Sequence, residues 1–155
     1  MAGLEAIVAV YGDWGIGADG TQPVTVSADR KHFRDLTMGA AVIVGRRTLA
    51  DFPGGRPLKG RTNIVLSRTA EPVEGAVMAR SAAEYPRTLC IGGASVYRAL
   101  FPHFTRVNVT KLDITPHSDA FFPNLDADPA WRIAEESEEQ EENGVRYRFL
   151  VYERR

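Results

Sequence analysis

The chain is poor in cysteine: Cys90 is the only one among 155 residues. A single cysteine cannot form an internal disulfide and leaves no cysteine-rich metal motif. Its apolar neighbours Leu89 and Ile91 indicate a buried strand, so we interpret Cys90 as a small core residue and not as a nucleophile. The sequence also lacks an apolar run of the ~20 residues that span a bilayer, and its N-terminus lacks a signal-peptide pattern. We therefore expect a cytoplasmic protein.

An excess of charge of either sign is also missing, because 19 basic residues balance 20 acidic ones. This balance gives no electrostatic reason to expect nucleic acid or a membrane surface as a partner. The three histidines, His32, His103 and His117, have no metal-site spacing and no serine or cysteine motif beside them. Zinc and a hydrolytic triad are therefore not expected. The length predicts one domain over residues 1–155, and we expect a monomer.

Short apolar, β-branched segments alternate with helical patterns along the chain. Strands buried on both faces have this composition, and the alternation is typical of a parallel sheet. We predict an α/β fold: one mixed, mainly parallel β-sheet flanked by helices, with a C-terminal β-hairpin that turns at "ENG". The strands are expected within 4–11, 40–45, 61–67, 76–79, 88–93, 106–114 and 131–155, and the helices within 28–37, 46–52 and 94–102.

Two polar stretches are expected to lie outside the regular elements. Residues 12–24, "GDWGIGADGTQPV", contain four glycines and a proline, so we predict a long functional loop with no helix or regular strand. The acidic run from Glu135 to Glu142 is interpreted as a solvated edge or loop. Trp14 and Trp131 are interpreted as packing residues.

Asp29 stands in the first turn of the predicted helix 28–37, one turn before Phe33. Two interpretations are open. With Ser27 as N-cap, an acidic residue in the first turn simply stabilises exposed N–H groups and the helix dipole. Alternatively, Asp29 faces a ligand.

Two junctions between a strand and a helix are rich in glycine or basic residues: "VGRRT" at 44–48 and "IGGASVY" at 91–97. Ligands of open α/β sheets lie beyond the carboxyl ends of the strands, where helix N-termini present donors to phosphates. The glycine pair could equally be a tight turn, and each arginine a solvated surface residue. Four arginines could gather at this rim of the sheet: Arg46, Arg47, Arg68 and Arg80.

The motifs, taken in order, resemble dihydrofolate reductase nearly from end to end. The resemblance includes "AIVAV" followed by "GIG", "VSADRKHF", "VIVGRRT", "GRPLKGRTNIVLS", "IGGASVY", "VTKLD", "DAFFP" and a final "YERR". It implies that NADPH is the cofactor and dihydrofolate the small-molecule substrate. The implied reaction is hydride transfer from C4 of NADPH to C6 of 7,8-dihydrofolate, with protonation at N5.

The resemblance also implies the substrate residues. Asp29 becomes the catalytic carboxylate, which accepts two parallel hydrogen bonds from the pterin, and the Thr110 hydroxyl supports it. Arg61 binds the α-carboxylate of the glutamate tail in a bidentate way. The pocket is expected to include Ile7, Val8, Ala9, Phe33 and Val44.

On the cofactor side, the resemblance implies contacts with the carboxamide, the pyrophosphate and the 2′-phosphate of NADPH. Ala9 and Ile16 approach the carboxamide, Arg46 and Thr48 meet the pyrophosphate, and a cis peptide joins Gly92 to Gly93. The loop 12–23 is expected to close over the nicotinamide. Around the phosphates we expect Gly45, Ile91, Gly92, Gly93, Ala94, Ser95, Val96 and Tyr97, and around the 2′-phosphate, favouring NADPH over NADH, Arg47, Ser67, Arg68 and Arg80.

Two other functions stay open, one of them because of a departure from the family pattern. Val24 stands where the family usually has tryptophan. A catalytically weak nucleotide-binding relative is therefore one alternative. Another is a pyrimidine reductase of riboflavin biosynthesis, which shares the fold and NADPH, although the pair Asp29 and Arg61 weighs against it.

Overall fold

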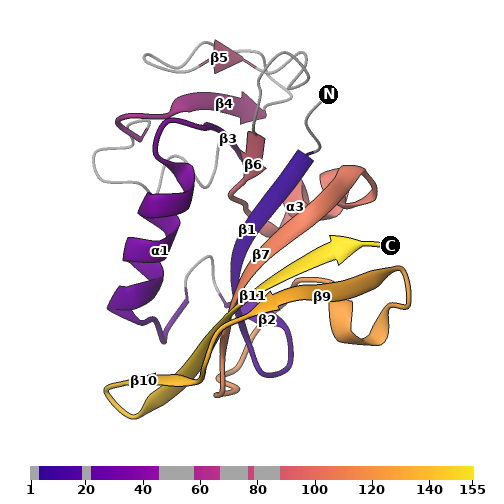
Figure 1. The fold of residues 1–155 in the computed structure, drawn as a ribbon. Helices are drawn as coiled ribbons and strands as arrows, with labels where there is room; N and C mark the ends of the chain where they lie inside the picture. Colours follow the sequence, from indigo (N-terminus) through magenta and orange to yellow (C-terminus); the bar gives the residue numbers. More distant parts are fainter. Residues whose placement is uncertain (1–3, 19–21, 46–57, 67–76, 79–87) are drawn as a thin grey trace.

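The computed structural model describes residues 4–18, 22–45, 58–66, 77–78 and 88–155 (Figure 1). Its helices are α1 (Ser27–Thr37) and α3 (Ala94–Leu100), with short 3-10 turns at Phe101–His103 and Leu125–Ala127. The strands are β1 (Leu4–Tyr11), β2 (Gly15–Gly17), β3 (Ala41–Gly45), β4 (Thr62–Leu66), β5 (Val77–Met78), β6 (Thr88–Cys90), β7 (Phe104–Leu112), β8 (Ala120–Phe121), β9 (Trp131–Glu136), β10 (Gln140–Glu142) and β11 (Val145–Arg154).

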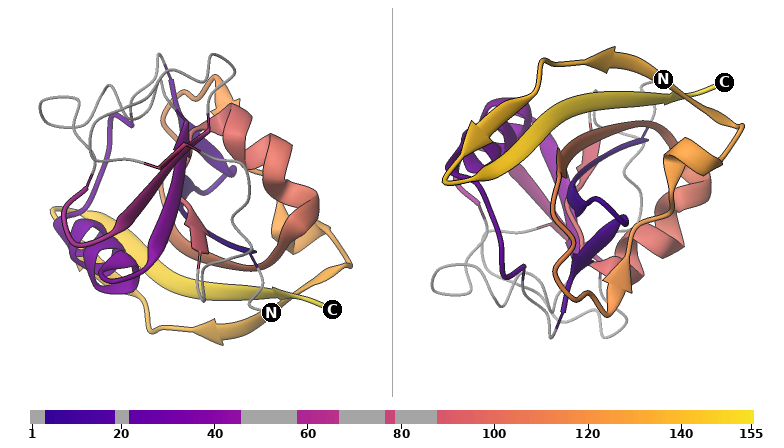
Figure 2. Two further views of the ribbon diagram at one scale, coloured as in Figure 1. Left: turned by 90° about the horizontal axis from the view of Figure 1, so that it is seen from above. Right: turned by 90° about the horizontal axis from the view of Figure 1, so that it is seen from below.

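Within the described residues, nine strands form one twisted sheet. Its order is β10-β11-β7-β1-β6-β3-β4-β5, and β9 pairs with β11. The pairs between β1, β3, β4, β5, β6 and β7 are parallel, whereas β9, β10 and β11 join antiparallel. This arrangement confirms the predicted mixed, mainly parallel α/β sheet. Seen from above and below, α1 lies beside the strands and the C-terminal hairpin (Figure 2).

The glycine-rich segment after β1 differs from the prediction. We expected no regular strand there, yet β2 forms and pairs antiparallel with β8. The main-chain N–H of Asp119 also donates to the Gly17 carbonyl, at 3.0 Å. The prediction was wrong because the partner of β2 comes from more than a hundred residues later in the chain, which local composition cannot indicate. The predicted helix at 46–52 lies outside the described residues.

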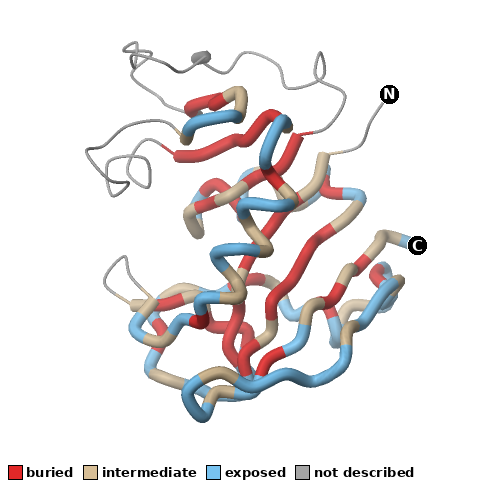
Figure 3. The backbone as a smooth tube through the Cα atoms, turned by 60° about the vertical axis from the view of Figure 1, so that its left-hand side comes forward, coloured by how far each residue is buried: buried red, intermediate tan, exposed pale blue. Residues whose placement is uncertain are grey.

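The core contains the apolar residues that the strand pattern predicted (Figure 3). Trp14 and Trp131 are both buried, which confirms them as packing residues. Phe122 contacts Trp14, Tyr97 and Phe101 through its ring. Burial also raises the pKa of the Cys90 thiol to about 12, in keeping with a core residue that does not act as a nucleophile.

The C-terminal hairpin turns where the sequence predicted. Asn143 and Gly144 both have positive φ, 50° and 81°, as a two-residue hairpin turn of the mirror-image type requires. The turn leaves Glu142 paired with Val145 at the start of β11. No helix of the described residues has the length and apolarity needed to cross a membrane.

Candidate active site

Asp29 faces the sheet, and its carboxylate meets β7. The Thr110 hydroxyl donates a hydrogen bond of 2.6 Å to Asp29 Oδ1. Burial raises the pKa of the Asp29 carboxyl above its ordinary value of 3.8, while the Thr110 bond and the nearby His32 act in the opposite direction. The ionised form is thus disfavoured by lost hydration and partly restored by a donor and a potential cation. A half-buried carboxyl in this balance is suited to bind a cationic or hydrogen-bond-donating heterocycle.

The start of α1 corrects the prediction for Ser27. The N-cap residue is Val26, which makes no side-chain capping bond, and Ser27 is already helical. The hydrogen-bond acceptors for the first N–H groups of α1 come from the Glu142 side chain instead. The Glu142 carboxylate accepts the Ser27 N–H, the Ser27 hydroxyl and the Ala28 N–H. The acidic run lies in the exposed edge strands β9 and β10, as predicted, and its last residue in addition contacts α1.

One face of α1 extends the site away from Asp29. Phe33 and Thr37 follow at successive intervals of four residues, so they share this face. Thr37 is fully buried; its hydroxyl donates to the Phe33 carbonyl at 2.7 Å and accepts from Arg61 Nε at 3.1 Å. The Arg61 guanidinium lies 5.9 Å from the centre of the Phe33 ring. The Phe33 ring and the Thr37 hydroxyl therefore position the Arg61 guanidinium at one end of the site.

The Arg61 guanidinium also donates to the Lys59 carbonyl, at 2.9 Å. Partial burial lowers its pKa, and the neighbouring Arg34 adds to this effect. Arginine stays charged despite such a shift. Two cations close together favour an anion between or beside them.

The residues of β1 divide between the two faces of the sheet. Ala9 lies opposite Thr110, and Ile7 opposite Asn108, in the parallel pair with β7. Because side chains alternate along a strand, Ile7 and Ala9 share the face of Asp29. The Val8 side chain instead belongs to the core cluster with Trp14 and Tyr97. Any contact of Val8 with a substrate would have to come from its main chain.

A glycine cradle lies where β3 and β6 end. The Gly45 N–H donates to the Gly92 carbonyl at 2.8 Å. A Cβ on Gly45 would come within 2.9 Å of the Val96 side chain, so only glycine allows this close approach. The peptide between Gly92 and Gly93 is cis, which confirms the prediction. Glycine-rich turns at the end of parallel strands are the kind of backbone that binds phosphates in other α/β proteins.

Tyr97 links the cradle to β1. Its hydroxyl is buried and donates to the Ile7 carbonyl at 2.7 Å, and burial raises the tyrosine pKa well above its usual range. The Ile91 N–H donates to the Ile43 carbonyl of β3. Ile16 packs against the core cluster. Ala94 and Ser95 begin α3, with Ser95 exposed. The other predicted cofactor residues, Arg46, Arg47, Thr48, Ser67, Arg68 and Arg80, lie outside the described residues.

Sequence reasoning missed two neighbours of the predicted site. The His32 ring stacks on Phe149 of β11, with ring centres 4.1 Å apart. Burial lowers the His32 pKa, whereas Asp29 and Asp35 raise it. Its position three residues after Asp29 was the available signal. Thr37 could have been found in the same way, from its spacing to Asp29 and Phe33.

A separate cleft of about 430 Å³ lies at the Gly12 end of β7 and β11. A Lys111–Asp126 ion pair of 2.9 Å is part of its wall. Apart from Gly12, the first residue of the predicted loop 12–23, no residue expected to bind substrate or cofactor lines this cleft, so it is distinct from the site around Asp29. Its lining residues are Gly12, Lys111, Leu112, Asp113, Asp126, Ile133, Glu136, Glu139, Tyr147, Arg148, Leu150 and Tyr152.

The fold and the site define an α/β protein with one half-buried carboxylate on the face of its sheet and a glycine cradle at the strand ends. Comparison with known proteins agrees. The family model described as dihydrofolate reductase matches residues 3–154. The chain is 40% identical over 147 residues to dihydrofolate reductase of Mycobacterium tuberculosis (strain CDC 1551 / Oshkosh), covering 90% of each chain.

Two further relatives extend the comparison. The dihydrofolate reductase of Neisseria gonorrhoeae is 34% identical over 161 residues, with 98% of each chain covered. A solved structure of dihydrofolate reductase from Enterococcus faecalis, complexed with NADP(H) and RAB-propyl, superposes with a TM-score of 0.84 at 27% identity. The match covers 97% of this chain and 95% of the other. The chain belongs to the dihydrofolate reductase family.

Proposed function

We propose that this protein reduces 7,8-dihydrofolate to 5,6,7,8-tetrahydrofolate with NADPH. The observation that carries the proposal is the Asp29 carboxylate, held by Thr110 on the sheet face and followed along α1 by Phe33. This arrangement supports the assignment of Asp29 as the catalytic residue. Membership of the family supports the same reaction.

Asp29 acts on the pterin ring through charge and geometry. In its ionised form it accepts two parallel hydrogen bonds, from the 2-amino group and the N3 region, and these fix the orientation of the ring. The negative charge favours positive charge on the bound ring, so N5 takes up a proton more readily. The Thr110 hydroxyl bonds Oδ1 and keeps the carboxylate turned toward the pocket.

Arg61 and the neighbouring apolar residues hold the rest of the substrate. Phe33 packs against the substrate beyond the pterin, while Ile7 and Ala9 form the floor on β1. Arg61, held by Thr37 and the Lys59 carbonyl, binds the α-carboxylate of the glutamate tail. A planar guanidinium can do this with two parallel bonds, which a lysine cannot.

The described part of the cofactor site fits a dinucleotide. The approach of Gly45 to Val96, which a Cβ would block, keeps the end of β3 close to the start of α3. Gly92 and Gly93 with the residues up to Tyr97 would hold the phosphates, and Ile16 and Ala9 the carboxamide. When bound, NADPH supplies the hydride.

A direct assay tests the proposal. The protein is mixed with NADPH and dihydrofolate, and oxidation is followed by the loss of near-ultraviolet absorbance of the reduced nicotinamide. Parallel reactions replace dihydrofolate with the pyrimidine substrate of riboflavin biosynthesis, or NADPH with NADH. Rapid oxidation with dihydrofolate and NADPH only is the expected result. Turnover of the pyrimidine alone, or of neither substrate, would contradict it.

The localisation, oligomeric state and partners that we propose follow from the same function. We place the protein in the cytoplasm as a monomer whose partners are the small-molecule substrate and cofactor. The balance of 19 basic and 20 acidic residues supports the absence of a nucleic-acid partner. Light scattering of the purified protein tests the monomer, and a mass of twice the chain would contradict it.

A further inference from the structure

We propose that Glu142, on the β10–β11 hairpin, is a positioning residue that holds the first turn of α1 and thereby the Asp29 carboxylate. The inference rests on the proposed function, because it takes Asp29 as the group that binds the pterin. Figure 1 shows the hairpin reaching the first turn of α1. Glu142 and Ser27 are 115 residues apart in the sequence.

Three hydrogen bonds make the contact. Glu142 Oε2 accepts the Ser27 N–H at 2.5 Å, and Oε1 accepts the Ser27 hydroxyl at 2.6 Å and the Ala28 N–H at 3.3 Å. The first N–H groups of a helix have no partner within the helix, and the N-cap residue Val26 supplies no side-chain acceptor. A carboxylate from another segment therefore performs the role that an N-cap side chain usually has.

The contact acts on Asp29 through one turn of backbone. Asp29 follows Ser27 by two residues, and its N–H donates to the Val26 carbonyl at 3.1 Å. The chain just before is fixed as well, because the Tyr11 hydroxyl bonds both the carbonyl and the N–H of Val24. Ser27 and Ala28 are thus the two helix residues whose N–H groups depend on Glu142.

The same hairpin also positions the partner of Asp29. β11 pairs with β7 so that Phe149 lies opposite Thr110, and His32 of α1 stacks on Phe149. Glu142 is joined to this strand through its pairing with Val145. One hairpin therefore fixes both sides of the Asp29–Thr110 contact: Thr110 through β7, and Asp29 through the first turn of α1.

Replacing Glu142 by glutamine tests the inference. Glutamine keeps the size but loses the charge and one acceptor oxygen. We expect kcat/KM for dihydrofolate to fall by about 3- to 10-fold, the effect of losing a helix cap, with an unchanged Kd for NADPH. Amide hydrogen exchange at residues 27–30 should become faster. Exchange does not depend on activity and reports the contact itself.

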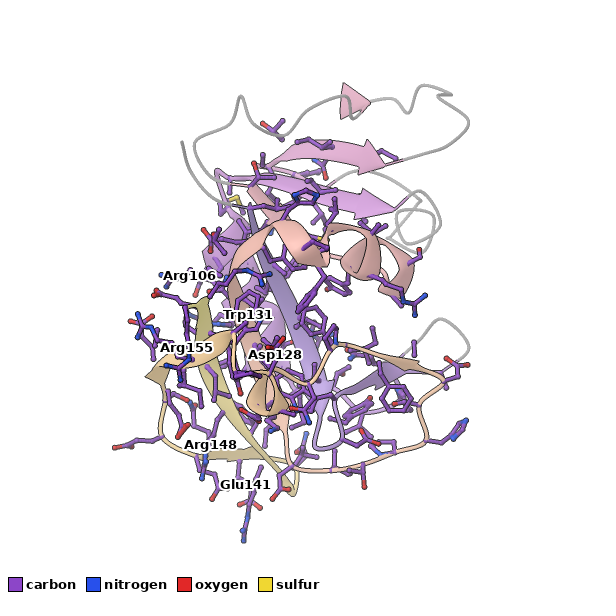
Figure 4. All side chains as sticks on the ribbon, turned by 90° about the vertical axis from the view of Figure 1, so that its right-hand side faces the viewer. Arg106, Asp128, Trp131, Glu141, Arg148 and Arg155 are labelled. Carbon is purple, nitrogen blue, oxygen red and sulfur yellow. The ribbon has the colours of Figure 1, made fainter. Side chains whose placement is uncertain are left out.

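Glu141→Gln is the matched control. Glu141, labelled in Figure 4, is exposed, adjacent and equally charged, and it lies opposite Arg146 in the hairpin. We expect Glu141→Gln to have the same kcat/KM for dihydrofolate, and the same rates of amide hydrogen exchange at residues 27–30, as the unaltered protein. Equal loss in both variants would reveal a general charge effect and overturn the inference. A lower melting temperature of Glu142→Gln with unchanged kcat/KM would also overturn it, since the contact would then be structural only.

A second substitution provides a rescue. In the Glu142→Gln background, Ser27→Asp places a carboxylate at the helix start and should restore part of the lost kcat/KM. In the unaltered background, Ser27→Asp sets two carboxylates against each other and should lower kcat/KM. Additive effects of the two substitutions would contradict the direct contact. If the unaltered protein failed to reduce dihydrofolate, the proposed function would fail; equal rates for Glu142→Gln and the unaltered protein would remove this inference alone.

Discussion

The two faces of the central strands β1, β7 and β11 differ in chemistry although they share the same backbone. On one face Val8, Val109 and Tyr152 belong to a buried cluster rich in aromatic rings. On the other face, Thr110 bonds Asp29, and Asn108 donates to the Glu5 carboxylate and the Ala6 carbonyl. That face also carries a smaller apolar cluster that includes Tyr11, Leu112 and Tyr147. Alternation of side chains thus separates a face used for packing from one that combines packing with polar groups.

The comparison indicates which property of the protein, stability or activity, each kind of substitution should change. Changes on the aromatic face remove packing and should lower stability. Changes to the polar residues on the face toward α1 should alter binding or turnover and leave the fold intact. Neighbouring residues on one strand can therefore serve as controls for each other.

The largest effect is expected at Asp29. Asp29→Asn should lower turnover at neutral pH by about 100-fold or more, with an unchanged Kd for NADPH, because the shape remains and the charge is lost. Steady-state kinetics and cofactor titration measure the two quantities. Unchanged turnover would remove Asp29 from the catalytic role.

The same variant has a stability signature. Burial raises the pKa of the Asp29 carboxyl, so ionisation is less favourable in the folded chain than in the unfolded one, and the folded protein loses stability as pH rises through that pKa. Asp29→Asn should therefore melt at a higher temperature than the unaltered protein at neutral pH. The difference in melting temperature should vanish when the pH falls below 3.8, the ordinary pKa of an aspartate carboxyl. Melting curves across this range check the sign.

Arg61 is expected to give the next largest effect. Arg61→Ala should raise the KM for dihydrofolate by about 10- to 100-fold, the value of a charge-assisted pair, with a smaller effect on kcat. Arg61→Lys keeps the charge but loses the planar guanidinium. Its KM for dihydrofolate should therefore lie between the values of the unaltered protein and of Arg61→Ala. Lys31→Ala, which removes an exposed cation of α1 that pairs with Asp35, is the control. An unchanged KM in Arg61→Ala would mean that the tail binds elsewhere.

Val109 tests the packing face. Val109 is fully buried, so Val109→Thr places a hydroxyl among apolar side chains and should lower the free energy of unfolding by about 1–3 kcal/mol. Chemical denaturation measures this change. Below the melting range, kcat/KM should match that of the unaltered protein. Loss of activity with full stability would show that the two faces are not separate.

Thr110→Val is the reverse substitution, one residue along β7, and has the smallest expected effect. Without the hydroxyl, Asp29 loses the bond that favours its ionised form, so its pKa should rise further. We expect kcat/KM to fall by about tenfold, the value of one charge-assisted hydrogen bond, and its pH dependence to move to higher pH. A pH profile identical to that of the unaltered protein would show that the Thr110 bond has no influence on catalysis.

Local patterns indicated most of the regular elements. Apolar β-branched runs predicted β1, β3 and β4, and "ENG" predicted the turn of the last hairpin, because both depend on neighbouring residues. β2 was not predicted, because its glycine-rich sequence does not favour a strand by itself. The strand forms only because β8 supplies its hydrogen-bonding partner. Ser27 was predicted as a cap for a similar reason: the sequence shows a suitable side chain but not the carboxylate that replaces it.

The sequence alone determined which segments are strands, where the chain turns, and that an acidic residue stands in the first turn of α1. The family resemblance implied Thr110 as the partner of that acid, and the structure confirms the contact, although the two residues lie 81 residues apart. Only the tertiary structure decided that Glu142 meets the first turn of α1. Glu142 and Ser27 are still farther apart. Contacts between distant segments depend on the order and register of strands in the sheet, and local periodicity contains no information about either.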